Sequence, residues 1–241
     1  CSGVVSRGAL TGKVRRTSTL KWALSSREQF DLAVGNPPFV RFQFVTDDDR
    51  ELIGQIEERL EIELGGVANL WIPVFLSALD RLVPGGAFAF VVPTECFTGV
   101  SAGAARQWLL KWTDCLHFDL FPSGSFPGVL QEVAIVSGRR RATPQRNPTN
   151  LTISDGDNRW THRVSVGTGS WMLYLLRSEH LEAIEAASTI PTSYPLGSVA
   201  KFGVSTVTGA NKFFSVNREV AQDYELERWT LPLLPRANKA R

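Results

Sequence analysis

The chain has 241 residues, of which 43% are hydrophobic and 21% charged, and its formal net charge is +2. This length and composition allow a substantial core, and no stretch reaches the roughly 18 consecutive apolar residues of a membrane-spanning helix. The N-terminus has no apolar core of the signal-peptide type, so we expect a cytoplasmic protein with no membrane partner.

The charged residues are unevenly distributed, with basic residues concentrated at 139–146 and acidic residues at 47–63. A basic run of this kind is typical of a solvated turn, and a phosphate contact is the alternative. The three cysteines, Cys1, Cys96 and Cys115, lack the spacing of a metal site or a disulfide framework. We therefore expect no metal, and reduced, mostly buried thiols.

The first two thirds of the chain alternate between apolar runs and amphipathic segments. The pattern predicts a buried parallel strand at 29–35, helices at 47–64 and 68–83, a strand at 87–93, a helix at 101–112, and strands at 115–121 and within 124–138. The Asp residues from 47 are expected to cap the first of these helices and Gly65-Gly66 to end it. This order predicts an α/β domain with a largely parallel sheet.

The pattern of apolar and polar residues changes after Arg141. Residues 142–150 are a candidate linker, and 151–166 suggest short strands around an Asp-Gly turn. A helix is expected at 179–187, and from 195 the chain is rich in β-branched and aromatic residues, which suggests a second domain.

The stretch "FDLAVGNPPF" places Asn36, Pro37, Pro38 and Phe39 directly after the first strand. Ligands of such sheets bind at the carboxyl ends of the strands, where 93–97 also falls. An amide oxygen accepts hydrogen bonds, and proline lacks an N–H and has a fixed φ, so the motif presents acceptors without a formal charge. Such a cluster suits an exocyclic amino group, and Phe39 suits stacking on the ring that carries it.

"GNPPF" resembles the catalytic motif of S-adenosylmethionine-dependent amino-methyltransferases. Within them the chain resembles the adenine-N6 DNA methyltransferases of restriction-modification systems. "NLWIPVFLSALDRLVPGGAFAFVVPTECF" and "SFPGVLQEVAIV" are similar to later segments of their catalytic domain, and "FGVSTVTGANKFFSV" to the opening of their target-recognition domain.

The resemblance implies the second half of a class I, Rossmann-like methyltransferase sheet, followed by the start of a β-rich target-recognition domain. The corresponding division is 1–145 for the partial catalytic domain, 146–190 for a linker and connecting elements, and 191–241 for the recognition domain. The implied cofactor is S-adenosylmethionine and the implied partner is double-stranded DNA. The target adenine must be flipped out, because its N6 is paired in the duplex.

The resemblance also implies roles for single residues. Asn36 and the Pro37 carbonyl accept from the target amino group, and Phe39 stacks on the base. Phe126 stacks on its other face, with Phe121 as the alternative. Phe75 and Ser18 are candidates for the cofactor's adenine, although Ser18 stands where the family has an acidic residue. The candidates for the DNA-facing loop are Thr208, Gly209, Asn211 and Lys212.

The chain departs from the family in lacking its glycine-rich turn and the acidic residue that holds the cofactor's ribose. Only 29 residues precede "FDLAVG", fewer than two strand-helix units of roughly 30 residues each require. We therefore expect a fragment that is inactive by itself, with an exposed sheet edge, whose partner is a missing N-terminal segment or a restriction subunit. The alternatives are a protein-glutamine or RNA amino-methyltransferase and a non-catalytic DNA-binding fragment.

Overall fold

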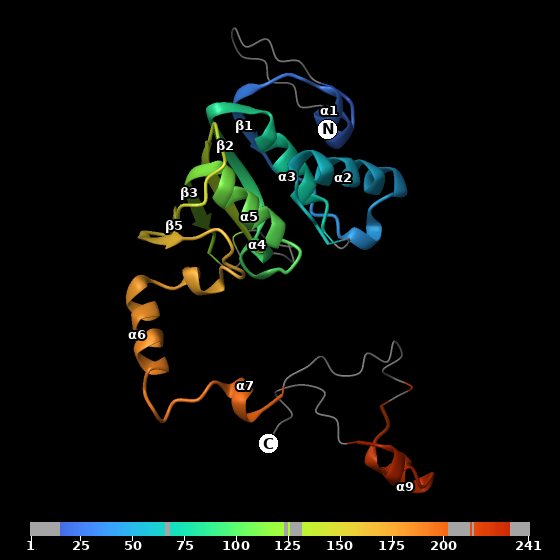
Figure 1. Cartoon of the computed structure of the whole chain (residues 1–241). Coiled ribbons are helices and arrows are strands. Elements are labelled where there is room, and N and C mark those ends of the chain that lie inside the picture. The colour runs from blue at the N-terminus through green and yellow to red at the C-terminus, as the bar shows by residue number, and fades with distance from the viewer. Residues whose placement is uncertain are drawn as a thin grey trace. The chain divides into compact units, whose positions relative to one another are not determined.

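The structure is a computed structural model that describes residues 15–65, 68–122, 125, 132–201, 213 and 215–231 (Figure 1). The chain divides into two compact units, Cys1–Ala186 and Ala187–Arg241. The first unit contains the predicted sheet and most of the helices.

The first unit is built on a sheet of six strands. Its described strands are β1 (Phe30–Gly35), β2 (Leu82–Pro93), β3 (Thr113–Leu120), β4 (Val133–Arg140), β5 (Thr149–Asp155) and β6 (Asn158–Val164), in the spatial order β1-β2-β4-β3-β5-β6. The α/β fold class is confirmed. The expectation of a largely parallel sheet is wrong, because only the pairs β1–β2 and β3–β5 are parallel, and β4 and β6 run against their neighbours.

β1 is an edge strand of the sheet. It was predicted to be buried, and that prediction is wrong. It pairs with β2 in the predicted parallel direction. Its alternate side chains Phe30, Leu32 and Val34 are 40%, 59% and 66% exposed. These residues share one face of the strand, since side chains alternate in a strand. The face is apolar and, apart from the contact between Phe30 and Trp22, uncovered among the described residues, as expected for the open edge of the sheet.

The helices of the first unit mostly follow the predicted order. They are α1 (Thr19–Ser25), α2 (Asp47–Leu60), α3 (Trp71–Asp80), α4 (Glu95–Thr98), α5 (Gly103–Trp112) and α6 (Ser178–Ser188), and the short 3₁₀ segments are η1 (Phe42–Phe44) and η2 (Met172–Leu175). α1 and α4 were not predicted. α2 is capped by Thr46 rather than by Asp, since the Thr46 side chain accepts from the Asp49 N–H. It ends at Leu60, before the expected glycines, because Glu61 adopts the left-handed conformation.

The core lies between the helices and one face of the sheet. Phe75 of α3 packs edge-on against Phe90 of β2, with ring centroids 5.2 Å apart. Phe118 of β3 contacts Phe97 and Trp171, both fully buried. α3 contacts β2, and α5 contacts β3.

The hairpin β5–β6 turns at Gly156 with φ of +58°, as the Asp-Gly signal predicted. β5 pairs with β3, so this part of the expected linker and connecting segment extends the main sheet. The functional division into catalytic, connecting and recognition segments stays a prediction.

The second unit contains the helices α7 (Leu196–Val199) and α9 (Arg218–Asp223) and the 3₁₀ segment η3 (Glu227–Trp229), and no strand among its described residues. Residues 202–212, where the β-rich part was expected, lie outside the described residues.

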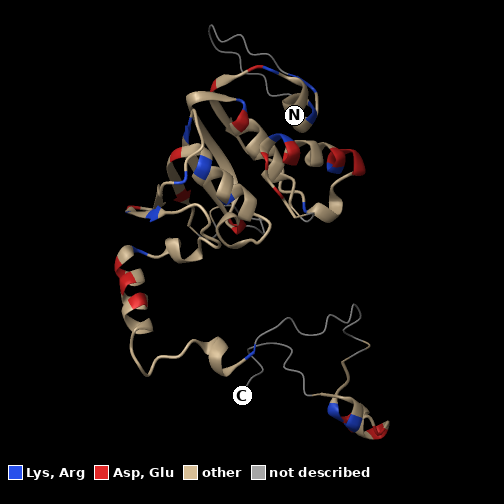
Figure 2. Cartoon of the chain, viewed as in Figure 1, with Lys and Arg blue, Asp and Glu red and all other residues tan. Residues whose placement is uncertain are grey.

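Acidic residues gather on α2 and along α6 (Figure 2). In the described part of the chain, no helix is both long and apolar enough to cross a membrane.

Candidate active site at the carboxyl ends of β1 and β2

The strand ends bring the predicted motif residues to one edge of the sheet. β1 ends at Gly35, β2 at Pro93 and β3 at Leu120, and these three strands run in the same direction. The segments that begin at Asn36, Thr94 and Phe121 therefore leave the sheet together. The topology thus places the Asn-Pro-Pro-Phe motif beside the segment 94–97, as the sequence predicted.

The motif itself combines an exposed amide with anchored neighbours. A Cβ at Gly35 would lie 2.8 Å from the ring of Phe90, so only glycine allows this ring to pack under the end of β1. Asn36 is exposed, and its side chain has no hydrogen-bond partner in the described part of the structure, whereas Pro37 is buried. Phe39 is partly buried against the core. The amide of Asn36 is therefore available to a ligand on a backbone that its neighbours hold.

A small polar network fixes the segment that follows the motif. The backbone N–H of Leu70 donates to the carbonyl of Val40 at 2.9 Å, and that of Phe42 to Asn69 Oδ1 at 3.3 Å. Asn69 Nδ2 in turn donates to Glu95 Oε1 at 2.6 Å. The segment just before α3 thus links the loop after β1 to Glu95 at the start of α4.

Glu95 receives a second hydrogen bond, from Trp71 Nε1 at 3.0 Å. Neither Asn69 nor Glu95 was singled out from the sequence. The available signal was their position, since each is a polar residue bordering an apolar segment, and Glu95 lies two residues after the carboxyl end of β2.

Arg106 of α5 anchors the segment after β2 through hydrogen bonds to its backbone carbonyls. Its guanidinium is almost fully buried and donates to the carbonyls of Cys96, Gly99 and Gly169, each at 2.9 Å. Burial lowers the pKa of this guanidinium. Arg106 thereby ties α4 to the connection that leads out of β6, which keeps Glu95 in place.

The predicted stacking and DNA-facing residues are only partly covered. Phe121, the alternative stacking residue, is 36% exposed just past β3, at the motif edge. The preferred Phe126, and Thr208, Gly209, Asn211 and Lys212, lie outside the described residues. Their roles stay predictions.

The two residues expected at the cofactor do not form a binding surface together. Phe75 has no exposed surface and packs among Trp71, Phe88 and Phe90. A ring without exposed surface cannot stack on a ligand, so this arrangement does not favour its expected role. Ser18 is exposed just before α1, and its side chain makes no capping hydrogen bond. The expected role of both residues in binding S-adenosylmethionine stays a prediction.

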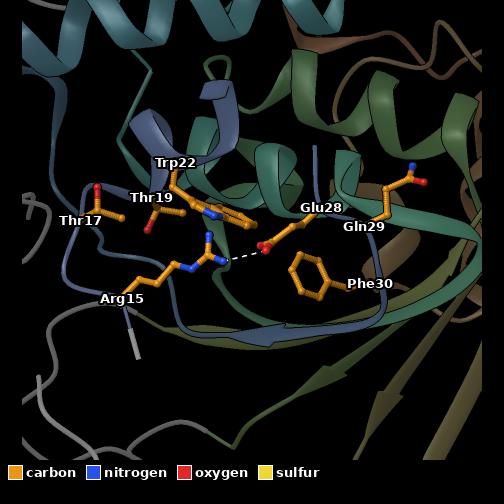
Figure 3. A pocket seen from close by; sticks show the side chains of 7 residues that line it. All are labelled: Arg15, Thr17, Thr19, Trp22, Glu28, Gln29 and Phe30. Atoms are coloured by element: carbon orange, nitrogen blue, oxygen red, sulfur yellow. Dashed lines mark hydrogen bonds and ion pairs between the residues drawn. The ribbon is translucent and has the colours of Figure 1, made fainter. Parts of the chain in front are cut away.

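A cavity of about 720 Å³ lies near Ser18 but at the amino end of β1, away from the motif. Its lining includes Thr17, Thr19, Trp22 and Phe30, and an Arg15–Glu28 ion pair of 2.7 Å crosses it (Figure 3). Because Phe30 starts the strand that Asn36 follows, this cavity is separate from the acceptor motif.

The cysteines differ from expectation. Cys96 is buried, but Cys115 is exposed, and Cys1 lies outside the described residues. Cys115 has a φ of +52° at an irregularity in β3, where the strand shifts register between Asp114 and His117. This local conformation turns the thiol away from the core.

Comparisons with known proteins agree with this architecture. Residues 11–124 match the family described as Eco57I restriction-modification methylase, and residues 168–241 match the family described as Type II methyltransferase M.Eco57I, C-terminal domain. The chain is related to methyltransferases of the restriction-modification type. The predicted resemblance to methyltransferases of restriction-modification systems is thereby confirmed.

Two curated restriction-modification relatives align with most of the chain. Type II methyltransferase M.AccI of Acinetobacter calcoaceticus is 20% identical over 236 residues, which cover 89% of this chain and 42% of that protein. Type II methyltransferase M.XhoI of Xanthomonas vasicola is 23% identical over 206 residues, which cover 75% of this chain and 36% of that protein. The chain therefore spans less than half the length of either relative.

Two solved structures align with parts of the chain. The type IIG restriction endonuclease BpuSI aligns with 89% of this chain and 29% of its own, at 14% identity and a TM-score of 0.45. A structure from a type I R-M system aligns with 73% of this chain and 33% of its own, at 21% identity and a TM-score of 0.44.

Proposed function

We propose that the full-length protein carrying this chain transfers a methyl group from S-adenosylmethionine to N6 of an adenine flipped out of double-stranded DNA, within a restriction-modification system. The observation that carries this proposal is the exposed Asn36 amide, which lacks a partner in the described structure and directly follows the strand β1. The relation to restriction-modification methyltransferases supports a DNA substrate.

Asn36 acts on the amino group of the base. Its side-chain oxygen and the Pro37 carbonyl each accept one N6 hydrogen, which directs the nitrogen lone pair toward the methyl donor. Acceptors of this kind stabilise the positive charge that develops on nitrogen when they are held in place beforehand. Asn69 and Glu95 hold the loop after the motif, so they serve as positioning residues for this step.

The aromatic side chains bind the flipped base. Phe39 stacks on one face and Phe126 on the other, a contact worth about 1–3 kcal/mol per base. Pro38 keeps the backbone between Asn36 and Phe39 rigid. Thr208, Gly209, Asn211 and Lys212 contact the DNA backbone at the start of the recognition segment.

The chain supplies the acceptor side of the reaction. Ser18 is the residue proposed at the methyl donor, and other parts of the full-length protein or a further subunit complete that site. The uncovered apolar face of β1 supports this arrangement, because it offers a surface on which further sheet or helix structure can pack. The isolated chain is then inactive in methyl transfer.

Product analysis tests the reaction. The full-length protein is incubated with labelled S-adenosylmethionine and duplex DNA, protein or RNA, and the labelled product is identified by mass spectrometry after hydrolysis. The proposal predicts N6-methyladenine from DNA. Methyl-glutamine or a methylated RNA base instead would replace it with the protein or RNA amino-methyltransferase.

Titration of S-adenosylmethionine into the 241-residue chain tests the division of the site. The proposal predicts no heat of binding at micromolar concentrations by the folded chain. Micromolar binding would show a complete donor site within these residues and would overturn the division, while leaving the reaction itself open to the product analysis.

A further inference from the structure

A pocket rich in arginine lies at the end of the sheet opposite to Asn36. Its volume is about 320 Å³, and it borders Gln29 before β1, Leu82 at the start of β2 and the end of β4. Five arginines and one carboxylate line it: Arg27, Arg59, Arg81, Arg140, Arg141 and Asp80. β1 separates this arginine pocket from Asn36 by roughly 20 Å, the length of six extended residues.

The single carboxylate in the lining of the arginine pocket does not balance the positive charge of its five arginines. Asp80 is the one carboxylate among the lining residues, and it is shared by Arg59 Nε at 2.9 Å and Arg81 Nη2 at 3.6 Å. Arg141 pairs instead with Asp114, which does not line the pocket. Arg27 forms no ion pair with any described residue. The lining therefore retains an excess of positive charge.

Arg140 forms no ion pair in the described part of the chain. Its Nη1 donates to the Arg141 carbonyl at 3.0 Å, and its guanidinium lies 4.1 Å from the centre of the Trp112 ring and 5.1 Å from that of Trp108. Carbonyls and ring faces orient a guanidinium but do not neutralise it. The side chain is thus fixed in place while keeping its full charge.

Two of these guanidiniums also have unused donors. Arg81 is only 6% exposed, and its Nε and Nη2 have no hydrogen-bond partner in the structure, as is true of Arg140 Nε. Burial, followed by the charge of Arg59, lowers the pKa of Arg81, and burial lowers the pKa of Arg140. Buried charges without full pairing destabilise a fold, so an anion that supplies acceptors here would be favourable.

We propose that the arginine pocket binds a phosphate group. A tetrahedral phosphate presents several oxygens at once, and guanidinium groups match its geometry with paired N–H donors. Arg27 and Arg59 are the accessible contacts at the rim, while Arg81 and Arg140 supply charge from the buried side. The phosphate can belong to a free anion or to the DNA backbone, and the two sources are distinguished below.

Thermal unfolding of the 241-residue chain tests the site with inorganic phosphate as the probe. Phosphate is titrated against chloride at constant ionic strength, and its affinity follows from the rise in Tm. The double variant Arg27→Gln/Arg59→Gln should bind at least about tenfold more weakly, a loss of the size expected for two charge-assisted contacts. Arg50→Gln is the control, because Arg50 pairs with Asp47 on the same helix as Arg59 but outside the pocket.

A second variant acts in the opposite direction. Asp80→Asn removes the carboxylate that competes with phosphate for Arg59 and Arg81, so it should increase phosphate affinity several-fold. General loss of structure cannot produce that gain. An equal Tm rise in phosphate and chloride, or equal phosphate affinity in the wild type and the Arg27→Gln/Arg59→Gln variant, would overturn the proposal.

Binding of a DNA duplex identifies the source of the phosphate. If the site holds the DNA backbone, the double variant weakens duplex binding and excess inorganic phosphate competes with the duplex beyond its effect on ionic strength. If the site holds a free anion, duplex binding is the same in the variant and the wild type while phosphate binding is lost. Both results support the phosphate site and assign its source.

Discussion

Asn69 donates its side-chain amide to Glu95 at 2.6 Å and accepts from the backbone N–H of Phe42 at 3.3 Å, so one side chain joins the loop after β1 to the end of β2. Asn69→Ala removes both bonds and should increase hydrogen exchange at the Phe42 amide by about tenfold or more, because its protection depends on that acceptor.

The control for this change is Asn150→Ala, at an exposed position in β5. In the full-length protein, Asn69→Ala should lower kcat more than it raises KM, since the acceptor motif loses its fixed position. Unchanged exchange at Phe42 in Asn69→Ala would mean that the network does not hold the loop.

The open face of β1 gives a matched pair of valine substitutions. Val34 is 66% exposed and Val92, on the neighbouring strand, is fully buried. In the 241-residue chain, Val34→Ala should lower the free energy of unfolding by less than about 1 kcal/mol, and Val92→Ala by about 2 kcal/mol. Urea unfolding measures both.

The same pair reports on what covers β1 in the full-length protein. If further structure packs on this face, the cost of Val34→Ala should rise toward that of Val92→Ala. A cost that stays small in the full-length protein would argue against such a cover.

Much of the first unit was predictable because its elements carry local signals. The apolar strands β2 and β3 and the helices α2, α3 and α5 follow from periodicity, and the turn at Gly156 from its Asp-Gly pair. Strand direction was not predictable in this way, since the placement of β4 between β2 and β3 depends on pairing between distant segments. The burial of β1 was predicted wrongly for a related reason, because an apolar sequence does not reveal whether another segment covers it.

In the candidate site too, residues with a local sequence signal were predicted, and contacts between distant segments were not. The Asn-Pro-Pro-Phe motif and its place at a strand end were visible in the sequence. The Asn69–Glu95 bond and the Arg106 clamp join segments 26 and up to 63 residues apart, and no local pattern marks such partners. Phe75 illustrates the converse, since an aromatic residue on an apolar helix suits a ligand or a core equally well until the packing is known.

Arg106 should be important for stability. Arg106→Met removes three hydrogen bonds to backbone carbonyls and leaves the buried Cys96 carbonyl without this donor, so we expect the free energy of unfolding to fall by about 3 kcal/mol. Arg163→Met, at an exposed position in β6, should change it by less than about 0.5 kcal/mol. Equal effects of the two substitutions in urea unfolding would show that the clamp contributes little.

The two described cysteines should differ in reactivity. Burial, with a smaller contribution from the charge of Glu95, raises the pKa of Cys96 to about 12 even though Arg106 opposes the shift. Its thiol therefore stays protonated at neutral pH and is shielded from reagents, while Cys115 is exposed. In a Cys1→Ser background, one thiol should react rapidly with a disulfide reagent and the second only after unfolding. Rapid reaction of both native thiols would contradict the structure around Cys96.

The acceptor role of Asn36 is the central claim, and methyl transfer by the Asn36→Ala full-length protein tests it most directly. Transfer to DNA should fall by about 100-fold or more, the size of effect seen when one preorganised polar group is removed from an active site. In the proposed role Asn36 contacts only the flipped base, so DNA affinity should stay within about threefold of the wild type. Asn158→Ala, at an exposed position in β6, should retain activity. Methyl transfer at the wild-type rate by Asn36→Ala would contradict the account and favour a non-catalytic, DNA-binding role for this chain.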